Sequence, residues 1–266
     1  LYRRTTGFLT EYFDFGALAS HPSYTVALSE NRVIFRTGSN SNPSNANIRV
    51  FQIENSTPME ESVELSFDSF PYFSAIDYTY GAITISADRI LLPCQFNVAS
   101  DWVSAILVLE QFDGVWRNTS LIGEVSPPIE RTVEKNRGDL LVVGDPNDLS
   151  QHFIYRWNGT SYVEEHSYTA SYQGPSYRVA LLEDVVVYSI GNVFLRVLEH
   201  DGASWNQVQE LLIDDLIGGF GEFFAVGPLL FFHTSINRYR ILKWQNSSLS
   251  VAGIFEPTSP IVDNSS

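Results

Sequence analysis

The sequence predicts an all-β protein built from repeated antiparallel units of four short strands. A strand–turn–strand pattern recurs along the chain, and no segment keeps a helical period over three turns. Polar hairpin turns, marked by Asn55, Asp113, Asn158, Asp201 and Asn246, follow at spacings of 58, 45, 43 and 45 residues. A period of about 45 residues carrying four strands is the size of a β-propeller blade.

The first half of each unit is a short strand, a polar turn and a dense apolar strand. Copies of this pattern occupy residues 25–35, 82–92, 131–143, 178–187 and 223–232. The dense strands Leu140–Val143, Val185–Val187 and Leu229–Phe232 are apolar at consecutive positions. A strand needs this composition only when both faces are buried, as for inner strands between neighbouring blades. We therefore expect these strands to be covered on both sides.

The second half of each unit is an alternating strand, a tight turn and an outer strand. Asp113-Gly114 and Asn158-Gly159 are typical of hairpins, because a tight primed turn needs positive φ. Two outer strands carry the carboxylate pairs Glu60-Glu61 and Glu164-Glu165, which we interpret as protection of an outer edge. Neighbours on a strand point to opposite faces, so neither pair can flank one glycosidic bond.

The repeats place a β-propeller of five blades at residues 20–256. Within the preceding residues 1–19, Gly7–Phe15 alternates like one further strand, which would close the ring or pair with a neighbouring molecule. Residues 257–266 form a C-terminal tail. The chain begins with Leu1 rather than Met, so we expect a processed or partial product.

Short motifs recur in phase with these repeats. They are Tyr80-Gly81, Asp113-Gly114 with Trp116, Gly144-Asp145-Pro146, Asp201-Gly202 with Trp205, and Phe220-Gly221. In them the sequence resembles the FG-GAP repeats of integrin-α-like β-propellers, in which Phe-Gly, a short strand, an apolar strand and Gly-Ala-Pro follow one another. Members normally have seven blades and five repeats are visible here, so the ring closes with five or the chain is part of something larger.

The resemblance also bears on calcium. Members that bind calcium use an Asp-x-Asp-x-Asp-Gly loop, and no repeat of this sequence has one. The nearest oxygen cluster is Asp145, Asn147 and Asp148. Because calcium takes six or more oxygen ligands at set spacing, we expect these side chains to cap a turn instead, and we expect no cofactor.

Composition excludes several kinds of partner. Sixteen Lys and Arg against 31 Asp and Glu give a net charge of -15, which excludes nucleic acid and disfavours an anionic membrane surface. Cys94 is the single cysteine, so no intrachain disulfide forms, and its apolar surroundings predict a buried thiol. The five histidines show no metal-ligand spacing, and we expect His152 and His166 at the surface or in hydrogen bonds.

The tryptophans fall into two groups. Four of them lie within a few residues of the hairpin turns, namely Trp116, Trp157, Trp205 and Trp244. Their repetition in phase favours packing at the blade periphery over sugar binding. Trp102 lies outside that phase and is the candidate for an exposed ligand contact.

Five N-x-Ser/Thr sequons occur, at Asn55, Asn118, Asn158, Asn246 and Asn264. Three coincide with the outer hairpin turn, where a glycan fits. Together with the resemblance, they predict a secreted or cell-surface glycoprotein that is not an enzyme and serves as a structural or adhesive module. Its expected partners are proteins or further copies of itself, bound through the propeller faces or the N-terminal strand. The alternatives are a lectin-like propeller and an enzyme with a site in the central channel.

Overall fold

The computed structural model divides the chain into two compact units, Leu1–Val133 and Glu134–Ser266. It describes residues 2–5, 8–11, 25–28, 31–37, 47–54, 57–65, 75–77, 83–86, 88–98, 101–125, 128–129, 132–170, 178–190, 194–212, 223–235 and 238–255. These residues form β-strands joined by turns. They contain no helix, and therefore no helix long and apolar enough to cross a membrane. The expected all-β class is confirmed.

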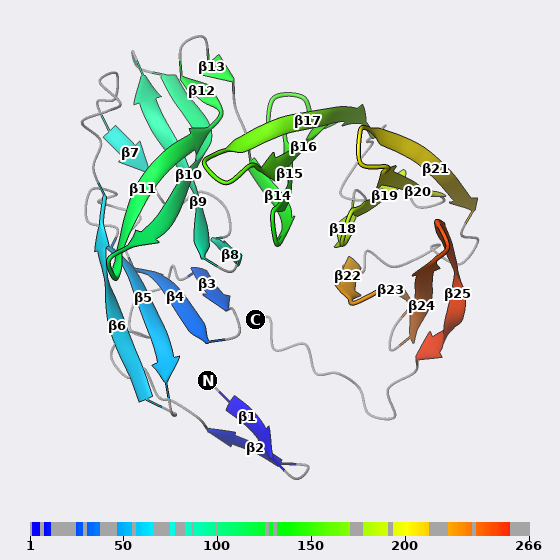
Figure 1. The fold of residues 1–266 in the computed structure, drawn as a ribbon, viewed down its shortest axis with the longest axis horizontal. Helices are drawn as coiled ribbons and strands as arrows, with labels where there is room; N and C mark the ends of the chain where they lie inside the picture. The colour runs from blue at the N-terminus through cyan, green and yellow to red at the C-terminus, as the bar shows by residue number, and fades with distance from the viewer. Residues whose placement is uncertain are drawn as a thin grey trace. The chain divides into compact units, whose positions relative to one another are not determined.

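The second unit contains three antiparallel sheets of four strands each (Figure 1). The first is β14 (Thr132–Arg137), β15 (Leu140–Gly144), β16 (Gln151–Trp157) and β17 (Tyr162–Thr169). The second is β18 (Val179–Leu182), β19 (Val185–Ile190), β20 (Phe194–His200) and β21 (Trp205–Leu212). The third is β22 (Phe223–Val226), β23 (Leu229–Ser235), β24 (Arg238–Gln245) and β25 (Ser248–Phe255). In each, neighbours in sequence pair in the sheet, as the repeat predicts.

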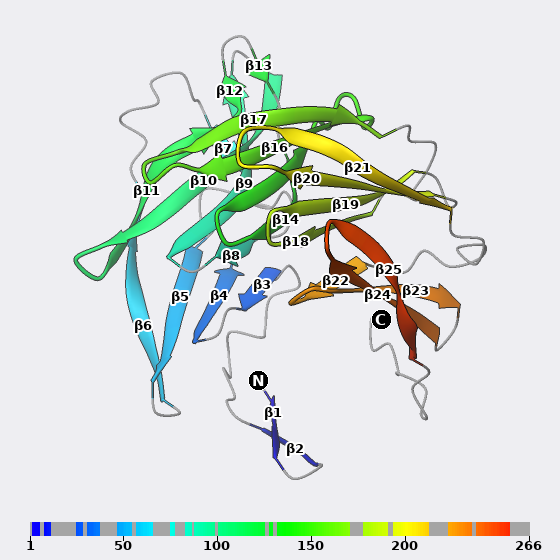
Figure 2. The ribbon, with the colours of Figure 1, turned by 45° about the vertical axis from the view of Figure 1, so that its right-hand side comes forward.

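The core of the second unit lies between these sheets (Figure 2). One apolar cluster joins β15–β17 to β18–β21 through side chains such as Val142, Ile154 and Leu181. A second cluster joins β18–β20 to β22–β25 through Val187, Leu230 and others. Each contact buries one apolar face of a sheet on its neighbour, and burial of that apolar area is the main stabilising contribution.

The first unit contains a sheet of nine strands. Its members are β3 (Thr25–Leu28), β4 (Arg32–Thr37), β5 (Asn47–Glu54), β6 (Thr57–Glu64), β7 (Ala75–Asp77), β8 (Thr84–Ser86), β9 (Arg89–Val98), β10 (Asp101–Phe112) and β11 (Val115–Ile122). It merges the first two repeats, because β6 pairs in parallel with β11 at Ser62 and Val115 (Figure 2). A short hairpin of β12 (Glu124–Val125) and β13 (Pro128–Ile129) lies outside it.

This parallel pairing corrects the interpretation of Glu60-Glu61 as edge protection. β6 is not a free edge, since Ser62, Val63 and Glu64 pair with residues of β11. The two carboxylates do point to opposite faces. Glu60 bonds Arg49 on the surface, whereas Glu61 is almost buried.

The N-terminal residues also differ from expectation. The sequence predicts one strand over Gly7–Phe15, of which the structure describes β2 (Phe8–Glu11); this strand pairs with β1 (Tyr2–Thr5) in a separate hairpin. The expected domain limits at residues 19–20 and 256–257, together with the tail, lie outside the described residues.

Two hairpin turns have the backbone that their sequences predict. Asp113 and Gly114 have φ of 51° and 78°, and Asn246 and Ser247 have 53° and 52°. The hairpins at Asn158-Gly159 and Asp201-Gly202 use longer loops, in which only the glycine has positive φ. The hairpins are therefore confirmed at all four sites, whereas the tight primed turn expected at Asn158-Gly159 is replaced by a longer loop.

Burial of the dense strands is confirmed in two sheets and wrong in the third. Every residue of Leu140–Val143 and Val185–Val187 is buried. In β23, Leu230 and Phe232 are buried, but Leu229 and Phe231 are only half-buried. The reason is that Leu230 and Phe232 face the cluster shared with β18–β20, while the opposite face of this sheet carries exposed side chains.

Candidate functional site

Among the described residues of the first unit, several polar contacts meet at Glu61 of β6. Its Oε2 accepts hydrogen bonds from the indole Nε1 of Trp116 at 2.9 Å and from Arg32 Nε at 3.1 Å. Its Oε1 accepts from Gln111 Nε2 at 2.8 Å, and the Arg32 guanidinium lies 5.4 Å from the centre of the Trp116 ring. The cluster joins β4 and β6 of the first repeat to β10 and β11 of the second.

Glu61 is held as a carboxylate in this cluster. Its side chain is 9% exposed, and such burial by itself raises the pKa of a carboxyl group. Hydrogen bonds from Arg32, Trp116 and Gln111 favour the charged form and outweigh it, so the pKa of Glu61 lies below its usual value of 4.5. An ionised acceptor with all of these donors is suited to joining strands rather than to proton transfer.

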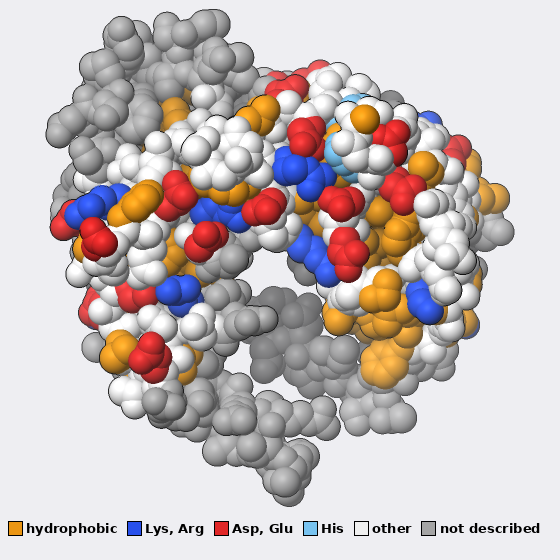
Figure 3. All heavy atoms as spheres, in the orientation of Figure 1, with side chains coloured by type: hydrophobic (Ala, Val, Ile, Leu, Met, Phe, Trp, Pro, Cys, Tyr) orange, Lys and Arg blue, Asp and Glu red, His pale blue; other side chains and the backbone are white. Residues whose placement is uncertain are grey.

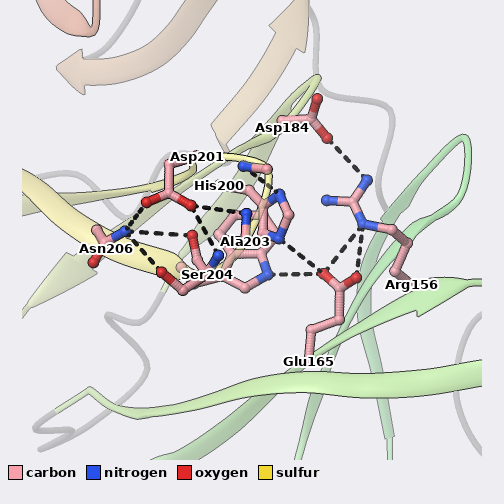
Figure 4. Close-up of polar contacts among 10 residues, drawn as sticks. Arg156, Glu165, Asp184, His200, Asp201, Ala203, Ser204 and Asn206 are labelled. Atoms are coloured by element: carbon pink, nitrogen blue, oxygen red, sulfur yellow. Dashed lines mark hydrogen bonds and ion pairs between the residues drawn. The ribbon is translucent and has the colours of Figure 1, made fainter.

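A similar cluster joins the first two sheets of the second unit (Figure 4). Glu165 of β17 accepts from Trp205 Nε1 at 2.9 Å and from Arg156 Nε at 3.0 Å. Arg156 also bonds Asp184 at 2.9 Å and lies 5.8 Å from the centre of the Trp205 ring. Burial lowers the pKa of Arg156, but its bonds to Asp184 and Glu165 raise it more, so the guanidinium stays charged.

His200 lies beside this cluster in a fixed orientation. Its Nδ1 accepts a hydrogen bond from the Gly202 N–H at 3.2 Å, so a neutral ring carries its proton on Nε2, which is 4.0 Å from Glu165 Oε2. Asp201 caps the same loop by accepting from the N–H groups of Ala203 and Ser204, each at 2.9 Å (Figure 4). These bonds lower the pKa of Asp201. The loop is thus held rigid by its own polar groups.

The residues nearest to a calcium loop form a capped turn. Asp145 Oδ1 accepts from the N–H groups of Asn147 at 2.8 Å and Asp148 at 3.3 Å. Asp148 Oδ1 accepts from the Ser150 hydroxyl at 2.6 Å and the Ser150 N–H at 3.1 Å, and these bonds lower its pKa. Within the described part of the chain, no three His, Cys, Asp or Glu side chains are grouped as a metal ion requires.

Sequence reasoning missed a buried pair beside this turn. His152 is buried, and its Nδ1 lies 3.0 Å from Glu134 Oε1, which agrees with the expected hydrogen bond but not with a surface position. Its ring stacks on Tyr168 at 5.3 Å. Gly144 pairs with His152 and leaves room for the Glu134 carboxylate, because a Cβ at this position would lie 2.5 Å from Glu134 Oε1.

The tryptophans separate largely as predicted. Trp116 and Trp205 are buried, which confirms packing for these two, and Trp102 is 43% exposed. Cys94 is fully buried, as expected.

The sequons occupy different surroundings. Asn158 and Asn246 are exposed on hairpin turns, whereas Asn118 is half-buried within β11. Asn158 Oδ1 accepts from the Thr160 N–H and hydroxyl, both at 2.9 Å. Asn55 and Asn264 lie outside the described residues.

One exposed apolar surface stands out in the second unit. Aromatic rings cross all four strands of the third sheet: Phe224 of β22, Phe231 of β23, Tyr239 of β24 and Phe255 of β25. Successive ring centres are 5.1, 6.0 and 6.2 Å apart along Phe231–Phe224–Tyr239–Phe255. We call this surface, with Val226, the aromatic face. Figure 3 shows hydrophobic side chains gathered over this sheet.

Comparison with known proteins supports the fold only. No protein-family model matches the sequence, and no curated protein matches it. Among solved structures, the chain is similar to a 6-phosphogluconolactonase candidate from Bacteroides uniformis, with a TM-score of 0.52 and 11% identity over 88% of this chain and 71% of that one. It is also similar to Sqt1 of Saccharomyces cerevisiae, with a TM-score of 0.52 and 10% identity over 92% and 64% of the two chains.

A third similar structure is a functionally unknown protein from Desulfotomaculum acetoxidans, with a TM-score of 0.54 and 9% identity over 90% and 71% of the two chains. At such low identity the likenesses establish a β-propeller-like fold and carry no activity with them. The resemblance to FG-GAP repeats stays a prediction.

Proposed function

We propose that the chain is a non-enzymatic structural or adhesive module of an extracellular glycoprotein, with five blades of the FG-GAP kind that form part of a larger assembly. The repeated four-stranded units and the propeller-like solved structures support the fold. The polar clusters support the role, because Glu61 and Glu165 are engaged in joining one sheet or repeat to the next.

The observation that carries the extracellular role is the exposure of two sequon asparagines on hairpin turns. Asn158 and Asn246 occupy the outer hairpins of the third and the fifth repeat, and both side chains are exposed. At Asn158 the side-chain oxygen is held by Thr160, which fixes the amide that a glycan would modify. Asn118 is half-buried in a strand, so we expect modification there to be the least complete.

Intact mass spectrometry of the full chain secreted from a eukaryotic host tests this proposal. We expect a mass above that of the bare chain, restored to it by peptide-N-glycosidase apart from one deamidation per site. Asn158→Gln and Asn246→Gln should each remove one glycan. Asn147→Gln is the matched control, because Asn147 is also exposed on a turn but does not begin an N-x-Ser/Thr sequon. A secreted chain that carries no glycan would contradict the proposal.

A lectin-like function is the second candidate, and the exposure of Trp102 favours it. The indole lies on β10, opposite Asn97 of β9, and is available for stacking on a sugar ring. A glycan array probed with the wild-type chain and with Trp102→Ala tests it. Sugar binding that Trp102→Ala abolishes would support the lectin-like function. If the folded wild-type chain binds no glycan on the array, the lectin-like function is excluded.

A further inference from the structure

The aromatic face of β22–β25 is unusual for a surface in contact with water. Phe224 is 42% exposed, Phe255 is 49% exposed and Val226 is 61% exposed. Val226 pairs with Leu229, and Phe224 pairs with Phe231, so these side chains share one side of the sheet. Contiguous apolar patches of this kind on soluble proteins mark contact surfaces.

The charge of this sheet differs from that of the remaining chain. Residues 223–255 contain no Asp or Glu and include Arg238, Arg240 and Lys243, in a chain whose net charge is -15. Lys243 pairs with Leu229 and so lies at the border of the aromatic face. Two copies of this sheet can therefore approach without bringing carboxylates together, which the acidic surfaces of the other sheets do not allow.

The same unit shows what covers such a face. The opposite side of β22–β25 packs its apolar side chains, such as Leu230 and Phe232, on β18–β20, and β18–β21 packs in turn on β15–β17. In both contacts an apolar face of a four-stranded sheet is covered by the apolar face of another four-stranded sheet. The aromatic face is apolar, as these covered faces are, and another four-stranded sheet with an apolar face fits it.

We propose that a second copy of this chain covers the aromatic face, so that two copies pack β22–β25 against β22–β25 about a two-fold axis. This inference goes beyond the proposed role by naming the partner and the surface. A two-fold contact brings the same patch of both copies together, and a sheet without carboxylates can meet its own copy in this way. Phe224 and Val226 of each copy then lose their contact with water.

The size of the face sets the strength of this contact. The four strands hold 27 residues in all, and at about 3.4 Å per residue and about 4.8 Å between strands they cover about 440 Å² per copy. The total of about 900 Å² lies in the range of weak, transient interfaces, so we expect a reversible dimer with a dissociation constant in the micromolar range.

Sedimentation velocity of the full chain between about 1 and 100 μM tests the proposal. The disrupting variants are Val226→Glu and Phe224→Glu, each of which places two carboxylates in a two-fold apolar contact. The matched control is Val251→Glu. Val251 is 65% exposed on the same sheet, but it pairs with Leu242, whose side chain belongs to the cluster on the opposite face.

Wild type and Val251→Glu should form dimers with similar dissociation constants, and Val226→Glu and Phe224→Glu should weaken dimerisation at least about tenfold. Raising the salt concentration should tighten the wild-type dimer, because it screens repulsion between two acidic molecules and between the paired cationic borders. A monomer at all concentrations overturns the proposal, as does a dimer that all three variants preserve. A dimer that salt dissociates indicates contact between the cationic sheet and an acidic surface, and overturns it also.

The dimer can be measured on unglycosylated protein, so its failure is separable from failure of the proposed extracellular role. Circular dichroism of each variant shows that the sheets are intact. If Phe224→Glu fails to fold, Val226→Glu still decides the outcome, because Val226 is the more exposed of the two.

Discussion

Glu61→Gln is the substitution that most directly tests the account of the polar clusters. It keeps the shape of the side chain but removes the charge that Arg32, Trp116 and Gln111 contact. One oxygen is replaced by an NH₂ group that faces donors. Arg32, whose side chain is 16% exposed, then loses its carboxylate partner in a site with little access to water.

The expected cost follows from these contacts. A hydrogen bond to a charged group contributes about 1.5–3 kcal/mol, and several such bonds in one cluster are not additive. Breaking a mostly buried ion pair by removing one partner costs about 3–5 kcal/mol. We therefore expect Glu61→Gln to lower the free energy of unfolding of the first unit by about 3 kcal/mol.

Glu60→Gln is the matched control. Glu60 is the next residue, its side chain is 47% exposed, and it bonds the half-exposed Arg49 at 2.6 Å. Exposed ion pairs contribute about 0–1 kcal/mol, because water solvates the separated charges. The same chemical change one position along the strand should therefore cost much less.

Cys94 provides an assay that reports on the first unit alone. It is the only cysteine of the chain and is fully buried, so a thiol reagent reacts with it only when the surrounding sheet opens. The labelling rate under native conditions, measured with increasing urea, gives the free energy of opening. Equal opening energies for Glu61→Gln and Glu60→Gln would refute the reasoning.

The pH dependence gives a second check. The pKa of Glu61 is lowered on folding, so its carboxylate stabilises the native state above its unfolded pKa of 4.5, and this stabilisation is lost as the pH falls through the lower folded value. The stability difference between wild type and Glu61→Gln should be constant above about pH 6 and shrink below about pH 4.5. A difference that persists unchanged in acid would contradict the assignment.

Three further substitutions test other features by urea denaturation. Gly114→Ala should cost about 1 kcal/mol, because Gly114 has φ of 78°, whereas Gly253→Ala, with open space for a Cβ and no left-handed backbone, should be close to neutral. Trp205→Phe should cost about 2 kcal/mol by removing the hydrogen bond to the Glu165 carboxylate, and a cost equal to zero would show that water replaces it fully. Val142→Ala should cost about 2–3 kcal/mol, because Val142 is fully buried between two sheets; an unchanged midpoint would contradict that packing.

The sequence predicts the elements well because local physical chemistry determines them. Hairpin turns such as Asp113-Gly114 require positive φ, and consecutive apolar residues such as Leu140–Val143 require two covered faces. Both signals lie within a few residues, and both are confirmed. Burial of Cys94 follows in the same way from its apolar neighbours.

The contacts between repeats could not be predicted in this way. Glu61 and Trp116 are 55 residues apart, and nothing within either strand distinguishes Glu61 from its exposed neighbour Glu60. Their roles differ because β6 pairs with β11, a parallel contact between strands of different repeats. The aromatic face could not be predicted for a similar reason. Leu229–Phe232 are all apolar, so the sequence does not show which face of this strand a neighbouring sheet covers.

The pairing of β6 with β11 also has a consequence for how the chain resists force. In the second unit the sheets contact one another through side chains, so load can separate them one sheet at a time. In the first unit two repeats share backbone hydrogen bonds at Ser62–Glu64, and separating them requires these parallel strands to shear together. The first unit should thus yield in one abrupt step and the second in several smaller ones.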